Sequence, residues 1–365
     1  MGRAPGRPYR GAMSSPAEAT RNVRARTPVP ADVERFLRDT PKVELHLHLV
    51  GSASPATLAA LAARHPDAGV PADPDALFTF RDFPHFIEVY DLVNALVRTP
   101  ADVADLVEGA ARDLAAHRVR WCEMTVTPFM HARRGLAHGG VVEGLAEGRR
   151  RAATLGVSFG WVYDIPGQFG QEAARETLRV ALDEAPPGLV GFGLAGAEAG
   201  VDRTAFGWAF DRARAAGLAS LPHAGEGDGP ASVRAALDRL GADRIGHGVR
   251  AVEDGDLVAR LAATGTPLEV CPSSNVCTRV VPALADHPIA RLRDAGVVVT
   301  VNTDDPHMFG TDLDEEYRRL AATFGWGVDD LAALVQAGIA ASLLDRPTKA
   351  RLAEEVAAAA TAARL

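Results

Sequence analysis

The sequence predicts a single α/β domain folded as a (β/α)8 barrel. From Pro41 onward, short apolar runs of strand type alternate with longer stretches that are rich in Ala and Leu and have helical periodicity. This alternation is typical of repeated βα units. Polar residues cluster where the apolar runs end. In a barrel these ends meet at one face, which is where active sites are assembled.

Eight apolar runs are candidates for the strands. They are residues 43–49, 120–126, 159–163, 189–194, 219–223, 244–246, 267–270 and 297–302. Each run is followed by a helix-like segment, such as residues 55–64 or 232–240. Eight such units fit a closed parallel barrel better than an open sheet.

The first 28 residues differ in composition from the rest of the chain. They are rich in Arg, Pro, Gly and Ser, and Glu18 is their single acid. Such a segment cannot bury enough apolar surface to offset the entropy cost of ordering it. We therefore expect a disordered basic tail over residues 1–28 and a barrel domain over residues 29–365.

Charge and composition narrow the class of partner. The formal net charge is -8, which argues against a nucleic acid or an anionic membrane as the main partner and favours a small molecule. No stretch approaches the roughly 18 apolar residues of a membrane helix. The spacing of Cys122, Cys271 and Cys277 matches no disulfide framework, so we expect free thiols in a cytoplasmic protein. The oligomeric state is not readable from the sequence.

Four residues at predicted strand ends form a candidate metal site. His46 and His48 are two apart in the first strand run, so their side chains point to the same face. His223 closes the fifth run in LPHAGEG, and Asp304 follows the eighth in VNTDDP. Three imidazoles and one carboxylate suit a zinc ion that keeps one position open for water. We expect one zinc per chain, which would lower the pKa of a bound water to about 7.

Two further residues could handle protons during hydrolysis. Glu226 lies three residues beyond His223, and a carboxylic acid held there could protonate a ring nitrogen beside the attacked carbon. His247, in RIGHGV after the sixth run, could orient the attacking water. The alternatives are a solvated loop acid for Glu226 and a hydrogen-bonded turn histidine for His247.

Six motifs carry a resemblance to a known family. They are PKVELHLHLVGS, GFGLAGAE, LPHAGEG, RIGHGV, LEVCPSSN and VNTDDP. In this order and spacing they resemble the adenosine and AMP deaminases of the amidohydrolase superfamily, and the match covers roughly residues 33 to 345. The resemblance implies a metal-dependent hydrolase barrel that deaminates a purine nucleoside.

The resemblance also implies a role for individual residues. His46, His48, His223 and Asp304 would bind zinc, Glu226 would donate the proton, and His247 would orient the water. Asp304 would also accept a proton from that water. Asp305 would bond the imidazole side of the purine and the Gly196 backbone the opposite edge, although Gly196 could also be a plain turn glycine.

One position departs from the family pattern. Relatives usually carry an acid two residues after the second metal histidine, where it holds the sugar 5'-hydroxyl, and this chain has Val50. We therefore expect Val50 to contact the substrate and to favour an adenosine with an apolar or extended 5' position. The aromatic residues of LFTFRDFPHF could cover the mouth of the site or simply pack the helix on the barrel.

The main functional prediction is conversion of adenosine or a 5'-modified adenosine to the corresponding inosine compound and ammonia. The first alternative is deamination of 6-aminodeoxyfutalosine, a 5'-extended adenosine derivative of bacterial menaquinone synthesis, although the sequence identifies no cation for its carboxylate. Adenine deamination is a minor option. Nucleotide substrates rank low because no Lys or Arg lies between Val50 and Ala63. A catalytically silent nucleoside-binding barrel would require a broken ligand set, and every ligand is present.

Overall fold

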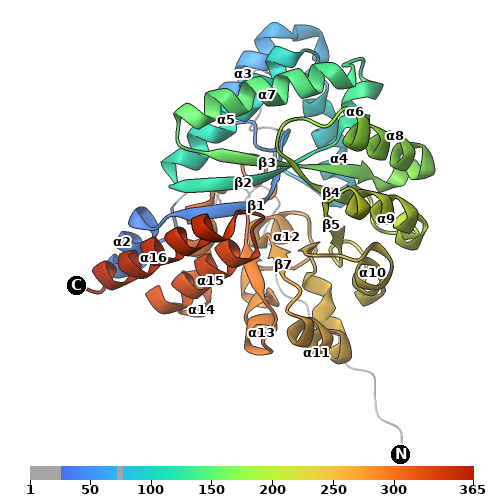
Figure 1. The fold of residues 1–365 in the computed structure, drawn as a ribbon. Helices are drawn as coiled ribbons and strands as arrows, with labels where there is room; N and C mark the ends of the chain where they lie inside the picture. The colour runs from blue at the N-terminus through green and yellow to red at the C-terminus, as the bar shows by residue number, and fades with distance from the viewer. Residues whose placement is uncertain (1–25, 72–76) are drawn as a thin grey trace, which may run out of the picture.

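Eight parallel strands form the centre of the molecule. The computed structural model describes residues 26–71 and 77–365. The strands follow one another around the sheet in chain order, from β1 to β8 (Figure 1). They are β1 Lys42–His48, β2 Val119–Val126, β3 Ser158–Pro166, β4 Leu189–Ala195, β5 Ala219–Ala224, β6 Ile245–His247, β7 Leu268–Val270 and β8 Val299–Val301. The predicted (β/α)8 barrel is confirmed, with strand ends that differ from expectation by at most a few residues.

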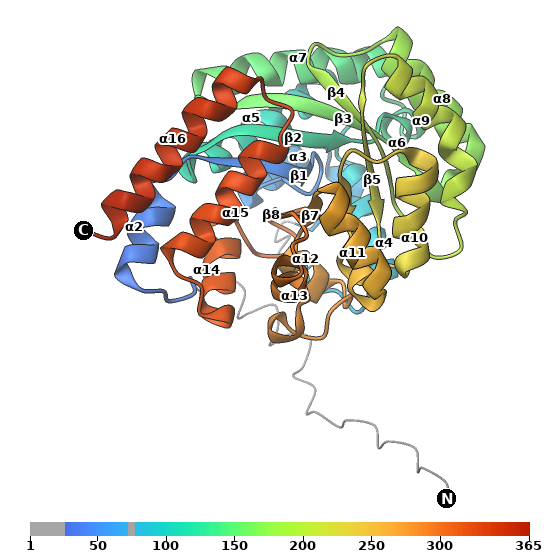
Figure 2. The ribbon, with the colours of Figure 1, turned by 60° about the horizontal axis from the view of Figure 1, so that its bottom comes forward.

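The first and last strands meet at a seam. β8 lies beside β1, as Figure 2 shows. An isolated parallel bridge joins Leu47 to Asp304. The His48 amide donates to the Asp304 carbonyl at 3.0 Å, and the Asp304 amide donates to the His46 carbonyl at 2.9 Å. The seam therefore holds together the two chain segments that carry three of the four predicted metal ligands.

Helices surround the sheet, as expected from the Ala- and Leu-rich stretches between the strands (Figure 1). Side-chain hydrogen bonds cap the first turn of several of these helices. Thr99, for example, forms a capping box with Asp102 at the start of α5. The helices are α2 Ala31–Asp39, α3 Pro55–Arg64, α4 Phe83–Asn94, α5 Pro100–Ala116, α6 Pro128–Arg133, α7 His138–Thr154, α8 Gly170–Asp183, α9 Gly207–Ala215, α10 Pro230–Ala235, α11 Gly255–Thr264, α12 Pro272–Cys277, α13 Ile289–Asp294, α14 Leu313–Phe324, α15 Val328–Ala341 and α16 Arg346–Ala363.

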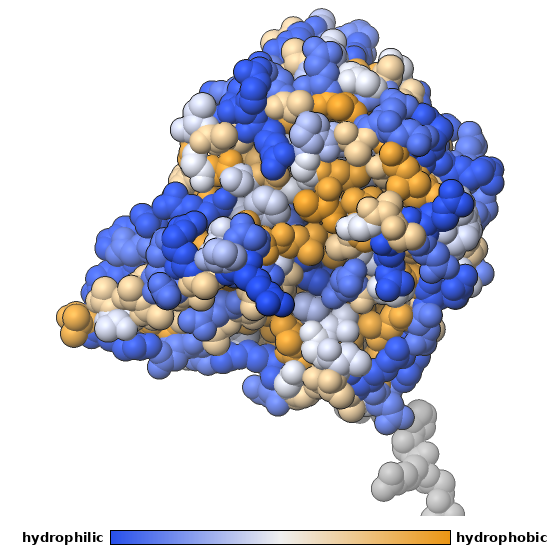
Figure 3. Space-filling model, viewed as in Figure 1, coloured by the Kyte–Doolittle hydropathy of each residue, from blue (hydrophilic) through white to orange (hydrophobic). Residues whose placement is uncertain are grey.

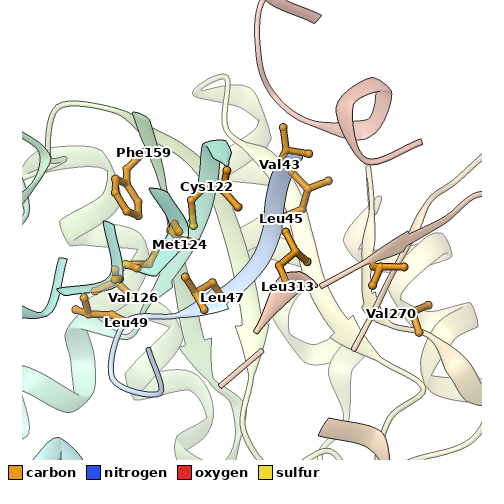
Figure 4. Packing of buried hydrophobic residues seen from close by; sticks show 14 of the residues in the cluster. Val43, Leu45, Leu47, Leu49, Cys122, Met124, Val126, Phe159, Val270 and Leu313 are labelled. Carbon is orange, nitrogen blue, oxygen red and sulfur yellow. The ribbon is translucent and has the colours of Figure 1, made fainter. Parts of the chain in front are cut away.

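Alternation along β1 separates the apolar core from the site. Val43, Leu45 and Leu47 are buried and pack beside apolar side chains of β2 (Figure 4). His46 and His48 occupy the intervening positions, and successive strand residues point to opposite faces. The same strand thus contributes to the hydrophobic core on one face and to the polar centre on the other.

The molecular surface is largely hydrophilic at its margins, and hydrophobic surface gathers near the middle of the face in Figure 3, over β3 and β4. Among the described residues, no helix is both long and apolar enough to cross a membrane. Cys122, Cys271 and Cys277 are unpaired.

The predicted tail falls largely on residues 1–25, which lie outside the described residues. Its last three residues are described. The Thr27 amide and hydroxyl both donate hydrogen bonds to the Glu315 carboxylate of α14, at 3.1 and 2.5 Å. The contacts of the barrel domain therefore extend to Thr27, two residues before the expected boundary at 29.

Candidate active site

Four predicted metal ligands converge at the carboxyl ends of the strands. His46 and His48 come from β1, His223 from β5, and Asp304 from the segment after β8. One ligand atom from each of the three histidines lies within 4.8 Å of the others. An Asp304 oxygen lies 3.5 Å from His46 Nε2 and 3.2 Å from His48 Nε2. The structure thus brings all four residues together in one buried cluster.

The state of His46 fits a metal ion. Its Nδ1 donates a hydrogen bond to a Glu269 oxygen at 2.9 Å, so the ring is oriented with Nε2 toward the cluster. This buried Nε2 has no hydrogen-bond partner. Burial opposes protonation, but the facing carboxylates of Asp304 and Glu269 raise the pKa of His46 to about 10. The cluster thus favours a cation, and three imidazoles with one carboxylate are a donor set that a divalent metal suits.

A buried ionic network holds the Glu269 carboxylate in place. Arg244 donates from Nε to Glu269 at 2.6 Å, and its other arm pairs with Glu123. Glu123 also accepts from the Trp121 indole at 2.8 Å. Glu123 lies within β2, Arg244 directly before β6 and Glu269 within β7, so the three are far apart in the sequence. No local pattern signals them, although LEVCPSSN contains Glu269.

Asp304 and His247 share an unusual backbone conformation. Their φ values are 66° and 59°, in the left-handed region that residues with a Cβ seldom adopt. Such strain costs on the order of 1–3 kcal/mol per residue and collects at functional sites. The Ser274 hydroxyl donates to Asp304 Oδ2 at 2.7 Å, which fixes the carboxylate.

Glu226 lies beside this cluster on the loop after β5. Its nearest carboxylate oxygen is 3.7 Å from His247 Nε2. Burial, together with repulsion by Asp304 and Glu198, raises the pKa of Glu226 well above its usual value. The protonated form of the side chain is therefore favoured, and a general acid acts in this form.

Glu198 organises the backbone of that loop. Its carboxylate accepts four successive backbone amides, from residues 225 to 228, at 2.6, 3.0, 2.7 and 3.0 Å. The Ser232 hydroxyl donates to it as well. Glu198 lies in the GFGLAGAE motif, but no sequence pattern predicts its role, because its partners are loop amides. It positions Glu226 without facing the metal cluster.

We expect Glu198→Gln to loosen this loop. The NH2 group of the glutamine would face backbone N–H groups from which it cannot accept hydrogen bonds. The loss of these bonds should lower the free energy of unfolding by about 1–3 kcal/mol. Displacement of Glu226 should also lower kcat by roughly tenfold. Denaturant unfolding and steady-state kinetics measure both, with Glu253→Gln, an exposed acid paired with Arg250, as the control. Unfolding and kcat values equal to those of the control would contradict the positioning role.

A hydrogen-bond chain fixes the tautomer of His247. The Ile289 amide donates to His287 Nδ1 at 3.1 Å, so His287 Nε2 carries the proton and donates to Asn275 Oδ1 at 3.2 Å. The Asn275 amide nitrogen then donates to His247 Nδ1, also at 3.2 Å. The proton of His247 is therefore on Nε2, which faces Glu226 and Asp304. Burial lowers the pKa of His247 to about 3, which keeps the ring neutral.

Asp305 and Gly196 line the same cavity as the cluster. Burial and the charge of Asp304 raise the pKa of Asp305 well above its usual value, so its carboxyl can donate a hydrogen bond. A Cβ on Gly51 would lie 1.7 Å from Asp305 Oδ1, so only glycine fits there. Gly196 has φ +81° and no room for a Cβ beside Gln168, which explains the glycine and leaves its backbone open to a flat ligand.

The Val50 side chain is placed differently from the expectation. It is 3% exposed, belongs to the hydrophobic core and is absent from the cavity wall. The reason is local: β1 ends at His48, and the chain then turns, with the Ser52 amide donating to the His48 carbonyl at 2.9 Å. Residues two apart share a face only while a strand continues. Tyr90 lines the cavity instead and is hydrogen-bonded to the Val50 backbone.

The cavity extends from the cluster along an apolar wall. Its volume is about 330 Å³. The wall is built by α4, α6 and the segment after β3 and consists of Phe83, Phe86, Ile87, Met130, Pro166 and Phe169. Between wall and cluster lies Asp164, which accepts from the Thr127 hydroxyl at 2.7 Å and whose burial raises its pKa to about 6. Of the four aromatic residues in LFTFRDFPHF, Phe83 and Phe86 line the cavity, whereas Phe78 and Phe80 pack in the core.

Comparison with known proteins places the chain among purine deaminases. The adenosine deaminase family model matches residues 41–359. An aminodeoxyfutalosine deaminase of Streptomyces coelicolor is 51% identical over 334 residues, which cover 90% of this chain and 86% of that protein. The crystal structure of an adenine deaminase from Arthrobacter aurescens has a TM-score of 0.83 at 34% identity and covers 87% of this chain and 98% of its own.

A zinc-bound amidohydrolase structure from Burkholderia ambifaria has a TM-score of 0.85 at 27% identity, with coverage of 92% and 96%. These matches span the barrel and all the motifs noted in the sequence. The chain is an aminohydrolase that belongs to the adenosine deaminase family.

Proposed function

We propose that this protein is a zinc-dependent 6-aminodeoxyfutalosine deaminase, which was the first alternative from the sequence. The observation that carries the proposal is the apolar wall that continues the cavity beyond the ligand cluster. 6-Aminodeoxyfutalosine is an adenosine whose 5' carbon bears a chain ending in a benzoate, and such an aryl group needs apolar surface. The similarity to the Streptomyces coelicolor enzyme supports the same substrate.

The chain's own residues suit each part of this reaction. A bound zinc ion would supply a water of lowered pKa as the nucleophile, held by His46, His48, His223 and Asp304. Glu226, in its protonated form, donates its proton to the purine nitrogen beside the attacked carbon. His247 presents its Nε2 proton toward the attacking water and orients it. Asp304 takes up the proton that the water releases and passes it to the amino group, so that the C–N bond breaks and ammonia leaves.

Substrate binding involves the rest of the cavity wall. Asp305 donates to the imidazole side of the purine, and the Gly196 backbone meets the opposite edge. Asp164 and Thr127, which also line the cavity, would hold hydroxyl groups of the ribose. Adenine deamination is the competing activity, and adenine would leave both this polar pair and the apolar wall without a partner.

A substrate panel tests the proposed function. The purified protein is assayed with 6-aminodeoxyfutalosine, methylthioadenosine, 5'-deoxyadenosine, adenosine and adenine by loss of the 6-amino absorbance. We expect kcat/KM to be highest for 6-aminodeoxyfutalosine, by roughly tenfold or more over adenosine, because burial of the extension adds about 25 cal/mol per Å². A higher kcat/KM for adenosine or adenine would refute the proposal.

A further inference from the structure

Arg133, beside the apolar wall, is an arginine that no described carboxylate pairs with. Arg133 is the last residue of α6, which follows β2 at the carboxyl face of the barrel. It is exposed, and its guanidinium carbon lies 5.0 Å from the centre of the Phe169 ring, which lines the cavity. A second ring, that of Phe129, lies 5.7 Å away. Stacking on aromatic rings therefore holds Arg133 beside Phe169, next to the lining residues of the cavity but not one of them, in a position that we term the rim.

Acidic residues neutralise the neighbouring arginines but not this one. Arg134 pairs with Asp91, and Arg81 lies 4.0 Å from Glu88. Both of these acids line the cavity. Within residues 26–71 and 77–365, by contrast, no carboxylate forms an ion pair with Arg133. The rim thus carries one uncompensated positive charge beside the apolar wall.

The geometry of this arginine suits a particular ligand group. A guanidinium that stacks on an aromatic face keeps its N–H edge free, and this edge matches a carboxylate with two parallel hydrogen bonds. The ligand would lay an aryl group against Phe169 and Met130 and present its carboxylate to the rim. We propose that Arg133 forms an anion subsite that binds the carboxylate of the substrate's 5' extension. This inference rests on the proposed function for its natural ligand.

A matched pair of probes tests the subsite independently of the natural substrate. The probes are 5'-arylthio adenosines that differ only in a carboxylate on the aryl ring, and both are assayed by deamination. The variants are Arg133→Gln, which removes the charge, and Arg133→Lys, which keeps the charge but loses the planar fork. Arg175→Gln is the control, because Arg175 is an exposed arginine of α8 that, unlike Arg133, does not stack on Phe169 of the cavity wall.

We expect Arg133→Gln to raise KM for the carboxylated probe by roughly tenfold, with kcat unchanged and the neutral probe affected less than about twofold. Arg133→Lys should restore part of the loss, and Arg175→Gln should match wild type. An equal loss on both probes, no loss on either, or a wild-type enzyme that does not favour the carboxylated probe would each overturn the subsite.

The same assay separates the two proposals. A wild-type enzyme that favours the carboxylated probe through Arg133, but prefers adenosine or adenine to 6-aminodeoxyfutalosine, would refute the proposed substrate and retain the anion subsite. A preference for 6-aminodeoxyfutalosine that Arg133→Gln leaves unchanged would refute the subsite and retain the proposed function.

Discussion

Exhaustive removal of metal is expected to abolish deamination, with a loss of roughly a thousandfold or more, and added zinc should restore it at about one ion per chain. Three histidines and Asp304 meet in one buried cluster, where the Nε2 of His46 has no hydrogen-bond partner. A divalent cation at this point would bind the imidazole nitrogens and offset the charge of Asp304. Elemental analysis and titration of the metal-free protein measure both effects.

Metal binding should also stabilise the fold, which gives a readout besides activity. A zinc ion that binds the folded barrel and not the unfolded chain would stabilise the fold, so the metal-free protein should unfold at a lower temperature. His46→Asn should lose both the metal and the higher unfolding temperature that the metal provides. His138→Asn, which changes a histidine of α7 paired with Glu176, should retain both. Full activity after metal removal, or a reproducible content near two ions per chain, would contradict the assignment.

Replacement of Glu226 by Gln is expected to lower kcat by about a hundredfold or more while zinc stays bound. Glutamine keeps the shape of the protonated carboxyl group but has no proton that it can transfer. Burial and the neighbouring carboxylates raise the pKa of Glu226, which favours the form of the native side chain that holds this proton. Steady-state kinetics and metal analysis of the same preparation separate loss of chemistry from loss of metal.

Asp228→Asn provides the matched control for this prediction. Asp228 is an exposed acid of the same loop, and its side chain accepts from the adjacent Gly229 amide at 2.7 Å. We expect its kcat to stay within about twofold of wild type, as for surface substitutions in general. If Glu226→Gln were as active as this control, another group would have to supply the proton.

The sequence predicts the fold and the ligand cluster well because both depend on local patterns. Each strand is a short apolar run, and His46, His48 and His223 lie within or at the end of one. The parallel topology then brings these ends together without further information. The same reasoning fails for Val50, because a spacing of two residues indicates a shared face only if the strand continues past His48.

The sequence could not predict contacts between residues that lie far apart in the chain. Glu269 orients His46, but Arg244 and Glu123, which hold Glu269, come from other strands and have no common motif. The apolar wall likewise combines α4 with α6 and the segment after β3. The placement of Arg133 beside Phe169 depends on the packing of two separate βα loops. No periodicity within one segment could indicate it.

The seam between β1 and β8 also determines when the metal centre can exist during biosynthesis. His46 and His48 leave the ribosome early, whereas Asp304 and the strand that closes the barrel are made near the end of the chain. A nascent or truncated chain that stops before β8 has two neighbouring histidines but neither the carboxylate ligand nor the backbone hydrogen bonds that hold it against them. Under the proposed function, a metal ion would therefore bind late, once β8 has closed the barrel and brought Asp304 to the histidines.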